Sequence, residues 1–477
     1  MRGTVRGPVR GTVRRTVSQI GITFLFALTF GGCAVGPNYK RPAVDAPPTF
    51  RGAPDGTPTT VSFGDQKWPD VFQDPQLQKL IRTALQKNYD VRIAATRILQ
   101  AQAQLSITRG DQLPSAAAGA SANDTRTSAS KLFGAINTSA SELEVGFQWN
   151  LDFWGKYRRA TEAARDQLLA SKWAQQEVNM TTVTGVASAY YTLREQDLQL
   201  QISRETLASN QDSLRLTQLL SDHGRTSLLD VRQAEQLVYA ASEAIPNLEK
   251  QIAQQENLIS ILIGENPAEV ARGLELTAQP HMPEVPAGLP SSLLERRPDI
   301  RDVEAQLMAA NAQIGVAKAA YYPAITLTAE GGAQSVALSN LFTGPAGLWS
   351  LAGQLTQPLY AGGQLRGAVK LSEAQKEQLA LTYQQTIQGA FREVSDALIA
   401  YKKDQDFRKQ QELLTAAAKD ASRLSNLRYK GGAASYLEVL DAETRQYAAE
   451  LTLAQAQLNE MLDYVQLYHT LGGGWDH

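Results

Sequence analysis

The sequence repeats itself over a very long interval. The stretch Lys87–Pro114 begins with Lys-Asn-Tyr-Asp-Val-Arg and ends in Leu-Pro. The stretch Arg296–Pro323 has the same length, begins with Arg-Arg-Pro-Asp-Ile-Arg and ends in Tyr-Pro. Gly224 and Gly432 keep nearly the same interval, each within a Gly-containing turn signal. A period of roughly two hundred residues is far longer than a solenoid repeat, so each half is a sizeable unit that the other half must complete. The sequence therefore predicts a duplicated fold.

The start of the chain has the composition of an export signal. Five arginines and no acidic residue lie in the first 15 positions, before an apolar run over 20–30. At about 11 residues this run is too short to span a bilayer. Cys33, the only cysteine, follows two glycines, the arrangement that a bacterial lipoprotein signal peptidase cuts, although Phe30 stands where Leu is commonest. We expect a signal peptide over 1–32 and a lipid on Cys33, with a buried free thiol as the alternative.

Charge and polar composition exclude several classes of function. Removal of the signal leaves 41 basic residues against 48 acidic ones, so nucleic acid is not an expected partner. The four histidines are scattered without metal-site spacing, and no metal or cofactor is predicted. His223, Ser227 and Asp230 are close in sequence, but they fall in one exposed turn without a strand-borne nucleophile or an oxyanion site. We therefore do not expect an enzyme.

One stretch alternates between apolar and polar residues without a break. It runs from Glu142 to Phe153, and only a β-strand keeps that period. A strand of about 12 residues suits a tilted crossing of a hydrocarbon core, and a soluble sandwich strand is the alternative. The side chains predicted to face lipid are Leu143, Val145, Phe147, Trp149, Leu151 and Phe153.

Each half combines one β-hairpin with long helices. The strand above pairs with Ser115–Ser121, and the second hairpin lies within 323–360. A helix should begin at Pro75, with Asp74 as its cap, and continue to about Asp111. Very long helices follow the hairpins, the first over Lys156–Asp222, which would measure about 100 Å. Leucine and valine at seven-residue intervals predict coiled-coil packing. In the last, returning helix we place Leu437, Leu440, Leu451, Ala454, Leu458, Met461, Val465 and Tyr468 in the seam.

Four strands in one chain cannot form a closed membrane barrel, because closure needs about eight strands at least. A dimer would supply eight strands around a filled interior, whereas a trimer would supply twelve strands around an open bore. The chain should therefore oligomerise. A periplasmic lipoprotein adaptor without its own pore would share the signal, the lipidated cysteine and the helical hairpins, but it would not show the duplicated order of helix, two strands and long helices.

Three motifs together resemble one family. They are Cys-Ala-Val-Gly-Pro-Asn-Tyr-Lys-Arg-Pro over 33–42, Leu-Glu-Arg-Arg-Pro-Asp-Ile-Arg over 294–301, and the stretch 311–323. The chain resembles the TolC-like outer membrane efflux family, in its NodT-type lipoprotein branch. The resemblance implies a mainly α fold with membrane β: a homotrimer whose twelve-stranded outer membrane β-barrel continues as a twelve-helix coiled-coil tunnel in the periplasm. It also implies an exit duct for drugs or other small molecules, joined by a periplasmic adaptor protein to an inner-membrane transporter of the resistance-nodulation-division (RND) type.

The same resemblance assigns roles at the periplasmic tip. The family narrows this tip with acidic side chains near the start of the last helix, where Glu438 and Asp441 match, and Asp230 is the first-half counterpart of Glu438. Tyr429 matches a residue that ties neighbouring helices together, while Ala434 replaces its companion arginine. The alternative for the acids is simple stabilisation of a helix N-terminus. The turns implied to face the adaptor contain Gly224, Arg225, Thr226 and Ser227 in the first half and Gly431, Gly432 and Ser435 in the second.

These patterns divide the chain into six segments. They are a signal peptide over 1–32, a lipid-anchored extended segment over 33–74, a first repeat over 75–264 with its hairpin at 114–153, an equatorial inter-repeat segment over 265–296, a second repeat over 297–470 with its hairpin at 323–360, and a tail over 471–477.

Overall fold

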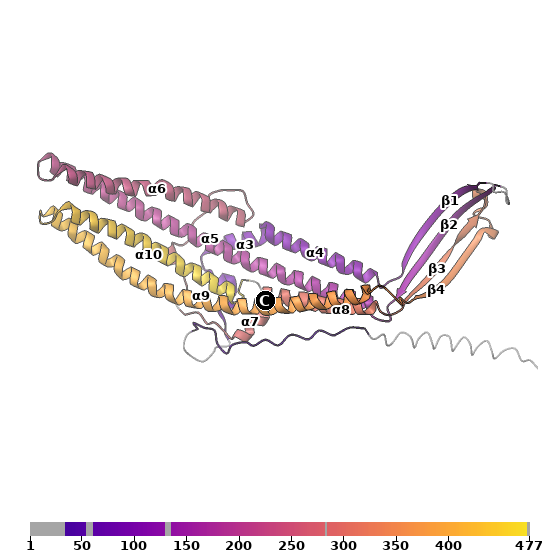
Figure 1. The fold of residues 1–477 in the computed structure, drawn as a ribbon. Helices are drawn as coiled ribbons and strands as arrows, with labels where there is room; N and C mark the ends of the chain where they lie inside the picture. The colour runs from indigo at the N-terminus through magenta and orange to yellow at the C-terminus, as the bar shows by residue number, and fades with distance from the viewer. Residues whose placement is uncertain (1–33, 54–60, 129–134, 282–283, 475–477) are drawn as a thin grey trace, which may run out of the picture. The chain divides into compact units, whose positions relative to one another are not determined.

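The α-helices and strands follow the same order in the two halves of the chain, apart from one short additional helix at the start of the first half (Figure 1). A computed structural model describes residues 34–53, 61–128, 135–281 and 284–474. The first half contains α2 (Trp68–Val71), α3 (Pro75–Lys87), α4 (Tyr89–Gly110), β1 (Ser115–Thr127), β2 (Ile136–Leu151), α5 (Lys156–Asp222) and α6 (Leu228–Leu262). The second half contains α7 (Pro290–Arg296), α8 (Pro298–Ala319), β3 (Ala324–Ser335), β4 (Gly347–Thr356), α9 (Gln364–Lys430) and α10 (Tyr436–Thr470). The predicted duplication and the mainly helical fold are confirmed.

Contacts divide the chain into two compact units. The first consists of Met1–Pro42, Gln100–Leu169 and Ala305–Leu381, and it contains all four described strands. The second consists of Ala43–Leu99, Ala170–Glu304 and Thr382–His477, and it contains the turns from α5 to α6 and from α9 to α10.

The four strands form one antiparallel sheet in the order β1-β2-β3-β4, side by side in Figure 1. The central pair joins the two halves of the sequence, with Trp149 of β2 opposite Leu327 of β3. β2 ends at Leu151, so the predicted extension of this strand to Phe153 is wrong. The reason is local: the carboxylate of Asp152 accepts the backbone N–H groups of Tyr157 at 3.1 Å and Arg158 at 2.8 Å, and thereby caps the start of α5.

The helix predicted from Pro75 to Asp111 is interrupted. Asn88 separates α3 from α4 and has an extended ψ of 134°. Its side-chain oxygen accepts the N–H groups of Asp90 at 2.7 Å and Val91 at 3.2 Å, so Asn88 caps α4 in place of continuing α3. Asp74 caps α3 ahead of Pro75, as predicted.

The two longest helices have 67 residues each, and each is followed by a returning helix of 35 residues. Most of the predicted seam of α10 is buried, including Ala454, Leu458 and Tyr468. Leu437 is wrongly placed in that seam, because it is 59% exposed while Tyr436 is buried. At the start of α10 the tyrosine packs in a cluster with Ala234 and Val439, which sets the face of the helix that turns inward.

Candidate functional site

The first helix-to-helix turn is built as a cap. Gly224 has a φ of +68°, a left-handed conformation that glycine adopts without strain. Ser227 accepts the N–H of Asp230 at 3.2 Å, and the Asp230 carboxylate accepts the N–H of Ser227 at 3.1 Å. The Asp230 carboxylate also accepts a hydrogen bond from the hydroxyl of Thr226. Within this chain Asp230 therefore serves as the capping acid of α6.

The second turn has the same backbone but different polar contacts. Gly432 has a φ of +72°, and Ser435 precedes α10 without a side-chain capping bond. Glu438 does not repeat the contact of Asp230, because its carboxylate pairs with Arg428 at 3.0 Å. The two repeats thus close equivalent turns in different ways, one by a capping box and the other by an ion pair.

Glu438 and Asp441 are exposed acids with arginine partners. Asp441 pairs with Arg445 at 2.8 Å, four positions further along α10, and more than half of each side chain is exposed. Exposed pairs of this kind contribute about 0–1 kcal/mol to stability, so a role in stabilising the fold does not account for these acids. Sequence reasoning missed both arginines, although the spacing of Asp441 and Arg445 was a usable signal.

Two tyrosines meet beneath this turn. The rings of Tyr429 and Tyr436 lie edge to face with centroids 5.2 Å apart. Their hydroxyl oxygens are buried and have no hydrogen-bond partner among the described residues. Burial raises the pKa of the Tyr436 hydroxyl, with Glu443 adding to the effect, so this group stays protonated. Tyr429 therefore acts within this chain as a packing residue of the hairpin end, beside the ion pairs described above.

One face of the sheet presents apolar side chains outward. Leu143, Val145, Phe147 and Trp149 of β2 are 39–52% exposed. Exposure continues on β3 and β4 with Leu327, Trp349, Leu351 and Leu355, of which Trp349 is 83% exposed. A shallow groove on this face is lined by Phe147, Trp149, Leu327 and Leu351 among others. A contiguous apolar surface of this kind marks contact with lipid or another apolar partner. Leu151 is half-buried at the end of β2, and Phe153 lies in the turn that follows.

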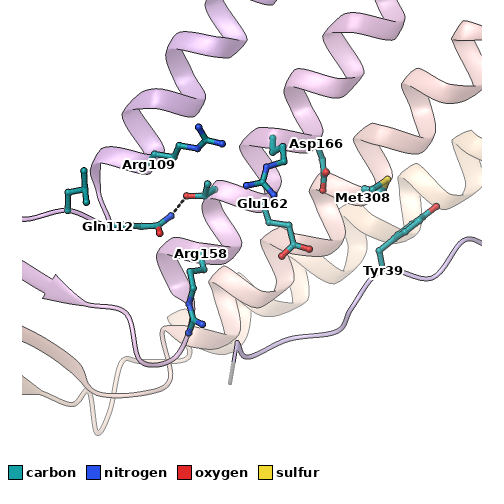
Figure 2. A pocket seen from close by; sticks show the side chains of 10 residues that line it. Tyr39, Arg109, Gln112, Arg158, Glu162, Asp166 and Met308 are labelled. Atoms are coloured by element: carbon teal, nitrogen blue, oxygen red, sulfur yellow. Dashed lines mark hydrogen bonds between the residues drawn. The ribbon is translucent and has the colours of Figure 1, made fainter. Parts of the chain in front are cut away.

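A cavity of about 740 Å³ lies at the first turns of α5 (Figure 2). Its lining combines arginines and acids with one hydrogen-bonded pair, the amide of Gln112 and the hydroxyl of Thr161. Burial raises the pKa of Asp166 to about 6, the neighbouring Glu162 adds to this, and Arg165 opposes it. The lining contains neither histidine nor cysteine, and its mixed charge suits polar contacts more than a nucleophile with its base.

Among the residues that the structure describes, no helix is both long and apolar enough to cross a bilayer. In the same part of the chain, no three side chains among His, Cys, Asp and Glu gather closely enough to hold a metal ion. Cys33, the predicted lipidation site, and the signal segment before it lie outside the described residues.

Duplicated helical hairpins, together with a sheet that has an exposed apolar face, define a class of envelope channel proteins, and comparison with known proteins agrees. The model of the outer membrane efflux protein family matches residues 80–265 and 289–473. The chain therefore belongs to the outer membrane efflux protein family, and its location is the outer membrane.

Relatives and solved structures cover nearly the whole chain. The probable efflux pump outer membrane protein TtgC of Pseudomonas putida is 37% identical over 94% of both chains, and the cation efflux system protein CusC of Escherichia coli is 32% identical over 95% of this chain and 98% of its own. The structure of the MtrE outer membrane channel of Neisseria gonorrhoeae in its open state is 31% identical with a TM-score of 0.84, covering 93% of this chain and 98% of that one. The outer-membrane channel OprN has a TM-score of 0.86 at 28% identity, with 93% and 100% covered.

Proposed function

We propose that this protein is the exit duct of a tripartite efflux pump, a homotrimer that passively conducts small molecules from the periplasm to the exterior. The observation that carries the proposal is the sheet. It has an apolar outward face, and within the described residues β1 and β4 each pair with one strand only. An edge strand in lipid leaves backbone groups without partners at a cost of several kcal/mol each, so the edges must be covered.

Three copies of the sheet supply twelve strands, enough to close a barrel around an open bore. Two copies would supply eight, whose interior side chains fill. The trimer is thus the smallest assembly that covers every edge and leaves a path for solutes. Its helical hairpins would continue as a tunnel of twelve long helices.

The partners we propose are a periplasmic adaptor protein and an inner-membrane transporter of the RND type. Relatives are named as outer membrane proteins of toluene, antibiotic and solvent efflux pumps and as a protein of a cation efflux system, so one fold serves chemically different cargoes. We therefore assign drugs or other small molecules as the cargo class and place selectivity in the transporter. The turns around Gly224 and Gly432 would receive the adaptor. Both turns expose polar backbone, and the two glycines have nearly the same positive φ.

We further propose that Glu438 and Asp441 form the periplasmic gate, with Tyr429 and Asp230 holding the two hairpin ends in shape. In a trimer, three copies of each acid would gather near one axis. There they would attract cations and, with their paired arginines, obstruct the bore.

Single-channel recording in planar bilayers tests both proposals. The purified protein should conduct, and replacing Glu438 and Asp441 together with alanine should raise conductance roughly twofold or more, because the carboxylates leave the axis and Arg428 and Arg445 lose the partners that hold them there. Asp420→Ala is the matched control, because Asp420 on α9 is also an exposed acid paired with an arginine three positions away. Absence of conductance in both the parent protein and the double variant would refute the duct, and a double variant that behaves like the Asp420 control would refute the gate.

A further inference from the structure

The segment that follows Cys33 is held by buried polar side chains. The Val35 N–H donates to the carbonyl of Trp154 at 3.0 Å, just after β2. The guanidinium of Arg159 donates to the carbonyl of Val35 at 3.3 Å, to that of Gly36 at 3.4 Å and to the side-chain oxygen of Asn38 at 2.8 Å. On α8, the amide of Asn311 donates to the carbonyl of Pro37 at 2.9 Å. Every residue in this contact belongs to the first compact unit.

The two side chains that hold the segment are themselves buried. Arg159 is 5% exposed and Asn311 is 1% exposed. Glu162 balances the charge of Arg159 through a pair at 2.8 Å, and the other donors of the guanidinium point to the segment. A buried arginine needs acceptors for its fixed fork of donors, and a buried amide needs one as well. Without the segment both side chains would lose partners that α5 and α8 do not replace.

Two glycines make the close approach possible. Gly36 has a φ of +105°, and a Cβ at this position would lie 2.5 Å from the Cα of Gly315. A Cβ on Gly315 would lie 2.7 Å from the carbonyl oxygen of Val35 and 2.8 Å from the Cγ of Arg159. Backbone therefore rests on backbone, in a geometry that only glycine allows at both positions.

From these contacts we propose that Arg159, Asn311 and Gly315 form a docking site for the chain's own segment 34–38, and that this site sets where a lipid on the preceding residue enters the membrane. The inference rests on the proposed lipid anchor. Trp154 lies between β2 and α5, so docking holds Ala34 close to the end of β2 that leads into α5. If the segment were released, residues 34–38 would form a tether of up to about 18 Å at 3.3–3.6 Å per residue, and an anchor would lose its fixed position.

The docked segment also completes a neighbouring cavity. Tyr39, which follows the docked residues directly, lines the cavity of Figure 2 together with Arg109 of α4 and Met308 of α8. Release of the segment would free the residues directly before Tyr39, so this wall of the cavity would lose support on one side.

Hydrogen exchange of the peptide that contains Val35 and Gly36 tests the site on the purified full-length protein. In the parent protein the Val35 amide should be protected, because it donates to the carbonyl of Trp154, although the segment has no helix or strand of its own. Gly315→Ala should speed exchange of this amide about tenfold or more, because a Cβ there collides with the segment. Gly367→Ala is the control: Gly367 lies in α9, in the same compact unit, where an added Cβ meets nothing within 4 Å.

A second variant guards against misfolding of Gly315→Ala. Asn38 is exposed, and Asn38→Ala removes only its bond to Arg159, so exchange should speed by about two- to fivefold in a folded protein. Unprotected amides in the parent protein, or unchanged exchange in both variants, would overturn the docking site. Bilayer conductance is recorded separately, so a duct that fails to conduct and a segment that fails to dock give different results.

Discussion

At the scale of single residues, Asp74 does more than cap a helix. Its carboxylate is fully buried and accepts the hydroxyl of Tyr190 at 3.0 Å, the N–H of Leu274 at 2.8 Å and the amide of Gln279 at 2.9 Å, besides the N–H of Gln76 at 2.8 Å. Burial by itself would raise the pKa of Asp74, but the bonds from Gln279 and the others outweigh it and lower this pKa. One carboxylate thus joins α3, α5 and the inter-repeat segment.

Asp74→Ala should lower the free energy of unfolding by about 3 kcal/mol, because it removes the cap and leaves several buried donors without an acceptor. Thermal and denaturant unfolding in detergent measure this. The exposed Asp70 provides the control, and Asp70→Ala should change stability by about 0.5 kcal/mol or less. Since the pKa of Asp74 is lowered in the fold, its contribution is present above the ordinary value of 3.8 and is lost as the pH falls through the folded pKa. A difference between parent and variant that persists undiminished below this range would contradict the account.

Glu177 on α5 shows the opposite shift. Burial raises its pKa to about 7, Asp299 and Glu393 add to this, and Arg297 opposes it. The folded protein therefore holds a proton that the unfolded chain releases near the ordinary value of 4.5. The contribution of Glu177 to the free energy of unfolding therefore becomes more favourable as the pH falls from above 7 toward 4.5. Glu177→Gln should stabilise the protein at pH 8 by about 1–3 kcal/mol and by little at pH 5.

Melting temperatures at both pH values check this prediction. Glu243→Gln serves as the control, because Glu243 is exposed on α6. An equal gain at pH 5 and pH 8 for Glu177→Gln would mean that its proton is not coupled to folding.

At residue scale, the sequence could predict Asp74 as a cap, because Asp-Pro is a local signal. It could not predict the bonds to Tyr190 and Gln279, since these residues are distant in the chain and their meeting depends on the tertiary fold. The acids Glu438 and Asp441 were found from a motif, whereas the pairing of Glu438 with Arg428 needed the geometry of the turn.

At the scale of elements, the duplication extends to single contacts. Asn88, at the break between α3 and α4, donates to the carbonyl of Leu262, the last residue of α6. Arg297, at the break between α7 and α8, donates to the carbonyl of Thr470, the last residue of α10. Each half thus ties the end of its returning helix to the break in its first helix, by an amide in one half and a guanidinium in the other.

A glycine follows each returning helix at this joint. Gly264 has a φ of +74°, and a Cβ there would lie 2.4 Å from the carbonyl oxygen of Lys87. Gly472 has a φ of +79°, and a Cβ there would lie 2.9 Å from the Cγ of Arg296. Gly264 faces rigid backbone, whereas Gly472 faces a flexible side chain that can move.

Gly264→Ala should therefore cost more stability than Gly472→Ala, about 2–4 kcal/mol against about 1–2 kcal/mol, through strain at positive φ and crowding. Unfolding measurements on the two variants give the order. Gly389→Ala is the helical control, with open space around its Cβ, and should be neutral or slightly stabilising. The reverse order of the two glycines would show that the joints are not built as described.

Long elements were predictable from sequence, and their interruptions were not. The absence of proline and the seven-residue spacing were sufficient to predict α5 from Lys156 to Asp222. The break at Asn88 was missed, because asparagine is tolerated inside helices and its distant partner Leu262 gave no local sign. The exposed Leu437 was misassigned since Tyr436 competes for the same packing position near the turn.

At the scale of the whole molecule, each half of the sequence supplies one hairpin, and the sheet joins them through β2 and β3. The sequence could predict both hairpins from their alternation and from the repeat. It could not predict the extent of β1, which continues to Thr127 rather than ending at Ser121, because its alanine, glycine and serine residues carry little periodic signal. The strands that pair with the two edge strands, β1 and β4, belong to other copies of the chain in the assembly that we propose.

The central claim is that copies of this chain pool their strands. The native mass of the purified protein in detergent, measured by light scattering or native mass spectrometry, tests this most directly. The account predicts a particle that contains three chains of about 52 kDa, less the mass of a removed signal segment. A stable particle that contains a single chain would contradict it, because the edges of β1 and β4 would then have no strand to pair with.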